Sequence, residues 1–147
     1  MGEVNRPQLR PRTHGDAVPT KPLVQALWLA DDVSKDPATG KVTVKGLFDR
    51  VYAKPPANEF NSRAYLFFGI TGVHGKVSLR LCYVDLSDNA VLLQRQWELE
   101  RTDPVALLDV AIRLRKIPIP HSGVYAWELY CDDDQIGSAR IRAFAGS

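Results

Sequence analysis

Short apolar or alternating runs recur every 10 to 15 residues or so from Leu23 onward. The segments between them are rich in Pro, Gly, Asp and Asn, which favour turns. Strand-like runs at this spacing are typical of sandwiches and barrels. The pattern predicts strands at residues 23–31, 41–53, 64–71, 76–86, 90–101, 106–117, 123–131 and 135–144. We therefore expect an all-β fold, an antiparallel β-sandwich of about eight strands, either immunoglobulin-like or C2-like.

The segment that follows Asp103 fits two kinds of secondary structure. Asp103-Pro104 resembles the start of a helix, because Pro is favoured at the first helical position. Apolar residues at every second position from Leu108 to Leu114 follow the period of a strand instead. We interpret the segment as a strand, and leave open a helical turn at residues 103–107.

The first 22 residues differ in composition from the rest of the chain. They contain four prolines, few apolar residues and no periodicity, which predicts a disordered, flexible arm. The arm has four basic and two acidic residues, a net charge of 4 − 2 = +2, and residues 23–147 have 15 of each sign. A neutral body makes nucleic-acid binding an unexpected function. The predicted organisation is a basic, proline-rich arm at 1–22 and one sandwich domain at 23–147.

Features of the chain also bear on its compartment. No apolar run reaches the roughly 18 residues of a membrane-spanning helix, and the first residues lack the apolar core of a secretory signal. Strand phase predicts that Cys82 faces outward and Cys131 inward, so the two should not form a disulfide. Free thiols suit a reducing compartment, and we expect a cytoplasmic protein.

Short motifs at both ends of the predicted domain resemble those of a known family. They are Ala30-Asp31, Thr39-Gly40-Lys41, Gly46 with Phe48-Asp49, and the set Pro120, Gly123 and Tyr125. Together they resemble a widespread family of uncharacterised bacterial proteins, each a single domain of unknown function. The resemblance implies a β-sandwich over most of residues 23–144, and it implies no activity and no functional residues.

Acidic residues in the predicted loops suggest a metal site. Alternate connections of an antiparallel sandwich share an end, so several aspartates should gather there. They are Asp31, Asp32, Asp36, Asp132, Asp133 and Asp134. Carboxylates of this kind bind calcium, as in C2-type modules. The plainer interpretation is turn chemistry, since Asp is a common turn residue, and a charged contact patch is a third possibility.

A binding surface is the other candidate site. Five arginines fall on the solvent side of their predicted strands, and they would form a basic stripe if those strands were neighbours: Arg80, Arg113, Arg115, Arg140 and Arg142. Val24 and Trp28 belong to a strand that is apolar on both faces, which could leave an exposed apolar patch. Arg95 shares the phase of apolar neighbours, which indicates a bulge or a side chain that reaches the sheet rim.

No catalytic constellation is visible from residue spacing. His121 and Ser122 are adjacent and should not face each other, and Thr39-Gly40-Lys41 lacks the other residues of a P-loop. No cofactor is predicted. We expect a non-enzymatic module for protein–protein interaction or self-association. The alternatives are a calcium- or anion-binding C2-like module and an enzyme of unrecognised type.

Overall fold

The computed structural model describes residues 22–56, 58–61, 63–103 and 105–145. The predicted arm at 1–22 lies outside this part except for Pro22. Eleven strands follow in chain order: β1 (Leu23–Lys35), β2 (Val42–Phe48), β3 (Arg50–Ala53), β4 (Glu59–Phe60), β5 (Ala64–Thr71), β6 (Gly75–Asp85), β7 (Ala90–Arg101), β8 (Leu108–Leu114), β9 (Ile117–Pro118), β10 (Gly123–Cys131) and β11 (Asp134–Ala145). The described residues contain no helix, so the all-β prediction is confirmed.

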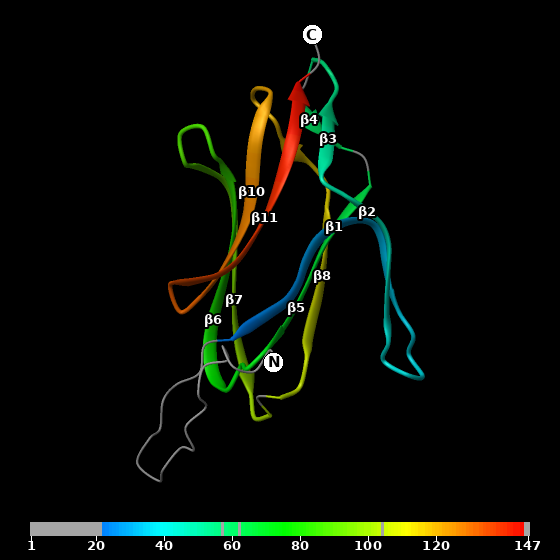
Figure 1. Cartoon of the computed structure of the whole chain (residues 1–147), viewed down its shortest axis with the longest axis vertical. Helices are drawn as coiled ribbons and strands as arrows, with labels where there is room; N and C mark the ends of the chain where they lie inside the picture. Colours follow the sequence, from blue (N-terminus) through cyan, green and yellow to red (C-terminus); the bar gives the residue numbers. More distant parts are fainter. Residues whose placement is uncertain (1–21, 57, 62, 104, 146–147) are drawn as a thin grey trace, which may run out of the picture.

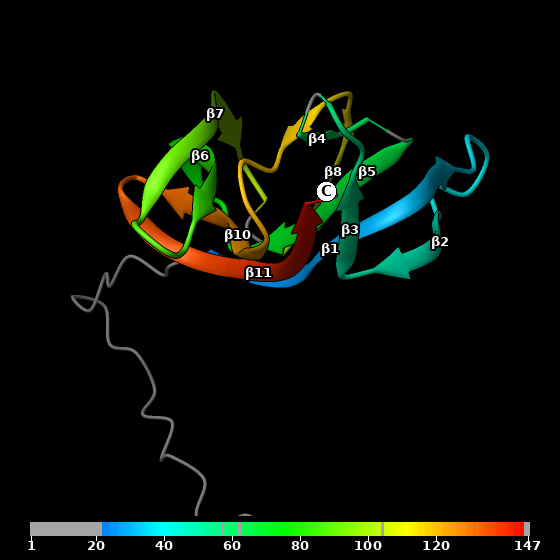
Figure 2. The same cartoon turned by 90° about the horizontal axis from the view of Figure 1, so that it is seen from above.

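Two main sheets form the two layers of a sandwich (Figure 1). One has four strands in the order β2-β1-β5-β8, and the other has five in the order β3-β11-β10-β6-β7. A small third sheet pairs β4 with β9. Seen from above, the layers converge where β1 passes β11, and the outer strands β7 and β8 flank the opposite side (Figure 2).

The chain crosses from one sheet to the other at Asp49. The prediction of one strand over residues 41–53 is wrong, because β2 ends at Phe48 in the four-stranded sheet and β3 begins at Arg50 in the five-stranded sheet. The Asp49 carbonyl accepts a hydrogen bond from the Arg142 amide at 2.8 Å. β3 then runs parallel to β11, so the expectation of a wholly antiparallel sandwich is corrected for this pair.

The core lies between the inner faces of the two sheets. Tyr83, Tyr125 and Phe68 are its largest fully buried side chains. The rings of Tyr83 and Tyr125 stack with centroids 5.5 Å apart, and the Tyr83 hydroxyl donates to the Pro118 carbonyl at 2.9 Å. Burial raises the pKa of Tyr83 well above its ordinary value. Burial of a large apolar side chain contributes about 1.5 to 3 kcal/mol to the free energy of unfolding, so the core between the two sheets is the main source of the stability of the fold.

The segment before β8 is a turn and not a helix. The Ala106 amide donates to the Asp103 carbonyl at 3.3 Å, and the Val105 amide donates to the Asp103 carboxylate at 3.0 Å. β8 then begins at Leu108 and pairs with β5, so the strand interpretation of the alternating residues is confirmed. The helical alternative is not realised among the described residues, because the chain passes from this turn directly into β8 at Leu108.

Both cysteines are free and buried. Cys131 contributes to the core, and Cys82 lies on the outer side of β6, as strand phase predicted. Cys82 is nevertheless buried, and the Arg80 guanidinium donates to its sulfur at 3.5 Å. The described residues contain no helix long and apolar enough to cross a membrane.

Candidate functional site

A surface with an apolar part and a basic part lies where the chain crosses between the sheets at Asp49. We call it the corner surface and define it by five residues: Trp28, Leu47, Arg50, Arg140 and Arg142. Its members come from β1, β2, β3 and β11, which meet at this side of the sandwich (Figure 2). The crossing therefore brings together side chains that are far apart in the sequence.

The apolar part is a hollow of about 270 Å³ beside Trp28 and Leu47. Leu47 pairs with Ala30, two positions beyond Trp28, so Trp28 and Leu47 share the outer face of their sheet. Trp28 is 44% exposed and Leu47 is 57% exposed. The Trp28 ring stacks on Phe67 with centroids 6.3 Å apart, which fixes its position while leaving much of the indole open to solvent.

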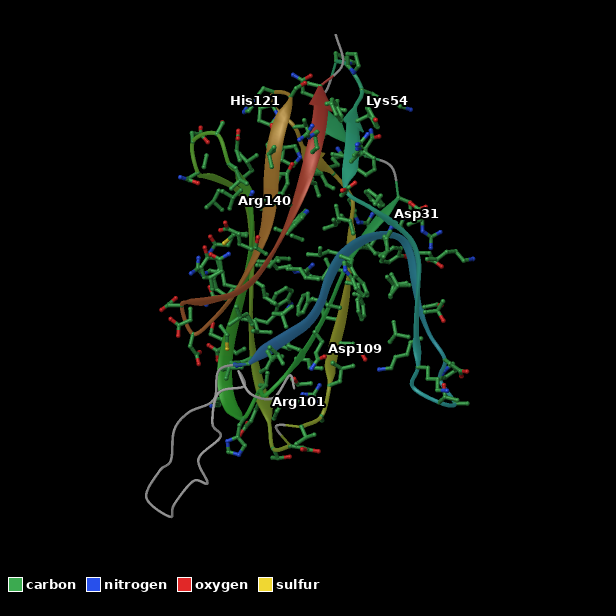
Figure 3. All side chains as sticks on the ribbon, viewed as in Figure 1. Asp31, Lys54, Arg101, Asp109, His121 and Arg140 are labelled. Carbon is green, nitrogen blue, oxygen red and sulfur yellow. The ribbon has the colours of Figure 1, made fainter. Side chains whose placement is uncertain are left out.

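The basic part is an adjoining hollow of about 360 Å³. Arg140 and Arg142 point outward from β11, and Arg142 lies beside Arg50 in the parallel β3–β11 register. Within the part of the chain that the structure describes, none of these three arginines forms an ion pair, and Asp49 is the only acidic residue lining the hollow. Arg140, labelled in Figure 3, and Asp49 line both hollows, so the apolar and basic parts adjoin at these two residues.

An exposed aromatic pair extends the corner surface along β3 and β11. Tyr52 and Phe144 are opposite each other in the register, and their rings stack with centroids 5.1 Å apart. Tyr52 is 59% exposed. Stacked aromatic rings beside arginines are rigid and bind apolar or planar groups with little loss of conformational freedom.

A second polar cluster joins Asp85, Ser87 and His121 near one end of β10 (Figure 3). Asp85 is buried, and its carboxylate accepts bonds from the Ser87 amide at 3.0 Å and the Ser87 hydroxyl at 2.8 Å. His121 Nε2 lies 2.6 Å from the Asp85 carboxylate, and Nδ1 lies 2.9 Å from the Ser122 carbonyl. Residue spacing could not reveal this cluster, because its members come from different loops.

The cluster favours a charged pair. Both ring nitrogens of His121 face acceptor oxygens, an arrangement that stabilises the imidazolium form, which donates from both. The bond to the Ser122 carbonyl and then the bond to Asp85 raise the pKa of His121. Burial raises the pKa of Asp85, but the bonds from Ser87 and His121 outweigh it, so this pKa lies below its ordinary value. The Ser87 hydroxyl already donates to Asp85. Through these bonds the cluster ties the β6–β7 turn to the loop between β9 and β10.

The six aspartates predicted to bind a metal do not gather in one place. Asp31 and Asp32 lie within β1, which is longer than predicted, and Asp32 pairs with Arg63 at 2.9 Å. Asp36 lies in the β1–β2 turn, and Asp132 and Asp133 form the β10–β11 turn on the other side of the molecule, with Asp134 at the start of β11 (Figures 1 and 2). Among the described residues no group of three His, Cys, Asp or Glu is arranged so that it could hold a metal ion.

Their side chains have other roles. The Asp36 carboxylate accepts from the Ala38 amide at 2.8 Å, and the Asp132 carboxylate accepts from the Ser78 amide at 2.9 Å. Asp133 lies 3.7 Å from the Arg80 guanidinium. These are the contacts of turn residues, which is the plainer interpretation of their sequence.

The predicted basic stripe divides into three parts. Arg80 packs over the Tyr130 ring, 4.3 Å from its centroid. Arg113 and Arg115 lie on or just after β8, which belongs to the other sheet. Arg140 and Arg142 alone join Trp28 at the corner surface. Val24 is half-buried, packs against the core and does not belong to that surface.

The structure adds Arg50 and Leu47, which sequence reasoning missed. Both flank Asp49, the crossing between sheets, and no turn signal in the sequence marks this crossing. Their alternation with Val51 and Phe48 was visible, but only the crossing brings them next to Arg142 and Trp28.

Comparison with known proteins agrees with the motifs at the two ends of the domain. No curated protein matches the chain. The model of a family of unknown function, DUF6941, matches residues 25–144, nearly the whole of the sandwich. Three residues of the motifs, Gly46, Asp49 and Tyr125, have structural positions at the hairpin, the crossing and the core. The chain therefore belongs to DUF6941, a family of unknown function.

Proposed function

We propose that this protein is a non-catalytic binding module that holds an acidic segment of a partner protein on its corner surface. The observation that carries the proposal is the group of three arginines without an ion-pair partner among the described residues, beside the exposed Trp28. The free thiols of Cys82 and Cys131 support a reducing compartment for it, such as the cytoplasm.

The chemistry of the surface favours a carboxylate ligand. Guanidinium groups donate two parallel hydrogen bonds to a carboxylate, a geometry that lysine cannot match. Arg and Trp are also the residues most enriched where binding energy is concentrated in interfaces. An apolar side chain of the partner would fill the hollow beside Trp28, while neighbouring carboxylates would meet Arg140 and Arg142.

The expected complex is weak and depends on salt. Exposed ion pairs contribute about 0.2 to 1 kcal/mol each, and the apolar hollow of about 270 Å³ holds little more than one large side chain. Charge pairs on an open surface are screened over about 10 Å at 0.1 M salt. Such a site suits a transient interaction whose association rate is increased by charge.

Isothermal titration calorimetry with a capped peptide in which glutamate and leucine alternate tests the proposal. We expect binding at low salt that weakens at least tenfold, about 1.4 kcal/mol, in the variant Arg140→Glu/Arg142→Glu. The matched control, Lys41→Glu/Lys76→Glu, also changes the formal charge from +2 to −2, since 2 − 4 = −2, but alters exposed lysines away from the surface.

Equal loss of binding in both double variants would mean that net charge and not the corner surface holds the peptide, and would refute the proposal. Unchanged affinity in the arginine variant would refute it as well. A second copy of the chain is the other possible occupant. Light scattering that finds a dimer, abolished by Arg140→Glu/Arg142→Glu, would replace the separate partner with self-association.

A further inference from the structure

A cleft lies between β7 and β8, on the side of the sandwich away from the corner surface. β7 ends the five-stranded sheet and β8 ends the four-stranded sheet, and no described strand pairs with the outer side of either. Figure 2 shows the two strands flanking this side of the molecule. The cleft has a volume of about 420 Å³, within the range of sites that take small molecules.

The floor of the cleft is apolar. Leu81 and Ile112 line it from opposite sheets, and both are buried. Leu93 lines it from β7 and is 38% exposed, although it shares the inner face of its sheet. An inward-facing leucine remains open to solvent here because the two sheets are not joined along this side.

Trp127 lines the same cleft and carries a hydrogen-bond donor without a partner. Its ring packs on Tyr83 with centroids 4.7 Å apart, and the residue is 2% exposed. Among buried side-chain nitrogen and oxygen atoms of the described residues, Nε1 of Trp127 is the one that lacks a hydrogen bond. A buried donor left without a partner costs about 1 to 3 kcal/mol, so native structures seldom keep one without a reason.

Basic residues surround the mouth of the cleft. Arg95 is on the inner phase of β7, opposite Leu81, and its guanidinium lies 5.6 Å from the centroid of the Trp97 ring. Arg115 and Lys116 line the side of β8, and Lys116 lies 4.0 Å from the Glu59 carboxylate. Among the residues that the structure describes, no acidic side chain lines the cleft. The sheet-rim explanation of Arg95 therefore fits the structure, and the bulge in this strand pair is elsewhere, at Tyr83/Val84.

We propose that the cleft binds a small amphipathic carboxylate, with an apolar body on the floor and the carboxylate at the basic mouth. The apolar lining and the cationic rim are complementary to the two parts of such a ligand. Arg95 holds the carboxylate, and the Trp127 ring forms part of the floor under the apolar body. This site is separate from the corner surface, and its failure would leave the proposed partner site untouched.

A nitrogen-15 NMR titration with dodecanoate, kept well below its micelle concentration, tests this assignment. The chain has three tryptophans, so three indole N–H signals report separately on the two sites. We expect a saturable shift of the Trp127 signal, because the bound chain covers the floor to which its indole belongs, while the Trp28 signal stays in place. Dodecyltrimethylammonium, with the same chain and the opposite charge, should leave the Trp127 signal unchanged.

The variants separate charge from fold. Arg95→Gln keeps an exposed polar residue on β7 and should weaken dodecanoate binding about tenfold, whereas the control Lys76→Gln should not. An unmoved Trp127 signal, an equal response to the cationic detergent, or wild-type affinity in Arg95→Gln would overturn the proposal. Signal broadening that grows with protein concentration alone would show a second copy in the cleft, which would also overturn it.

Discussion

The Asp85 cluster allows a prediction of stability with a magnitude. Asp85 is buried, and its carboxylate takes part in three hydrogen bonds, two from Ser87 and one with His121. Each hydrogen bond contributes about 0.5 to 1.5 kcal/mol, and bonds to charged groups contribute more. Asp85→Ala should therefore lower the free energy of unfolding by about 2 to 4 kcal/mol. In a domain near this size, that corresponds to a fall in Tm of roughly 8 to 16 °C.

Urea unfolding followed by tryptophan fluorescence at pH 6 measures this loss as a shift of the transition midpoint at constant slope. Asp88→Ala is the matched control. Asp88 is in the same loop and is exposed, and its carboxylate accepts one bond, from the Ala90 amide at 3.0 Å. We expect the control to lose less than about 1 kcal/mol. A loss in Asp85→Ala no larger than that of the control would refute the assignment of this cluster as a lock between loops.

Three further predictions concern pH, the β1–β2 hairpin and the N-terminal segment. His121 has a raised pKa in the folded protein, so the stability that its protonated ring contributes is complete below the unfolded pKa near 6.5 and is lost as pH rises through the folded pKa. Between pH 6 and 9, the free energy of unfolding should therefore fall more in the wild type than in His121→Gln. Equal pH dependence of the two proteins in urea titrations would contradict this. Gly46 has φ +72°, and a Cβ there would overlap the Asp31 carboxylate, whereas Gly40 has φ +73° and open space around it. Gly46→Ala should therefore lower the free energy of unfolding by about 1 to 3 kcal/mol, and by more than Gly40→Ala does in the same assay. Deletion of residues 1–21 should change Tm by less than about 5 °C in calorimetry if that segment has no buried contacts, and a larger fall would contradict this.

Strand positions could be predicted from the sequence wherever one face of a strand is buried. The strands predicted at residues 64–71, 90–101 and 123–131 match the bounds of β5, β7 and β10. Alternation marks most of β7, whereas β5 is marked by a nearly continuous apolar run that is buried on both faces, and both are strong local signals. β1 continues to Lys35, beyond the predicted end at residue 31, because its polar end pairs with β2 through the backbone and not through burial. Backbone pairing of this kind leaves no hydrophobic pattern.

The candidate site could be predicted only in part. The phase of Arg140 and Arg142 follows from alternation, whereas the strand of Trp28 is apolar on both faces and leaves its phase open. Which of these residues are neighbours depends on strand order, which is a property of the whole fold. Arg50 joins them because the chain crosses sheets at Asp49 and β3 pairs in parallel with β11. The aspartates depend on strand bounds instead: alternation of loops predicts that all six share one end, but Asp31 and Asp32 lie within β1, which is longer than its apolar pattern indicates.

The indole signal of Trp28 tests most directly whether the corner surface binds acidic segments. Trp28 is the exposed tryptophan beside Arg140 in the apolar hollow. In a nitrogen-15 NMR titration with the alternating glutamate–leucine peptide at low salt, we expect a saturable shift of the Trp28 indole N–H, weakened by added salt and lost in Arg140→Glu/Arg142→Glu. A Trp28 signal that does not move while the peptide binds elsewhere, or no binding at millimolar peptide, would mean that the corner surface is not the binding site.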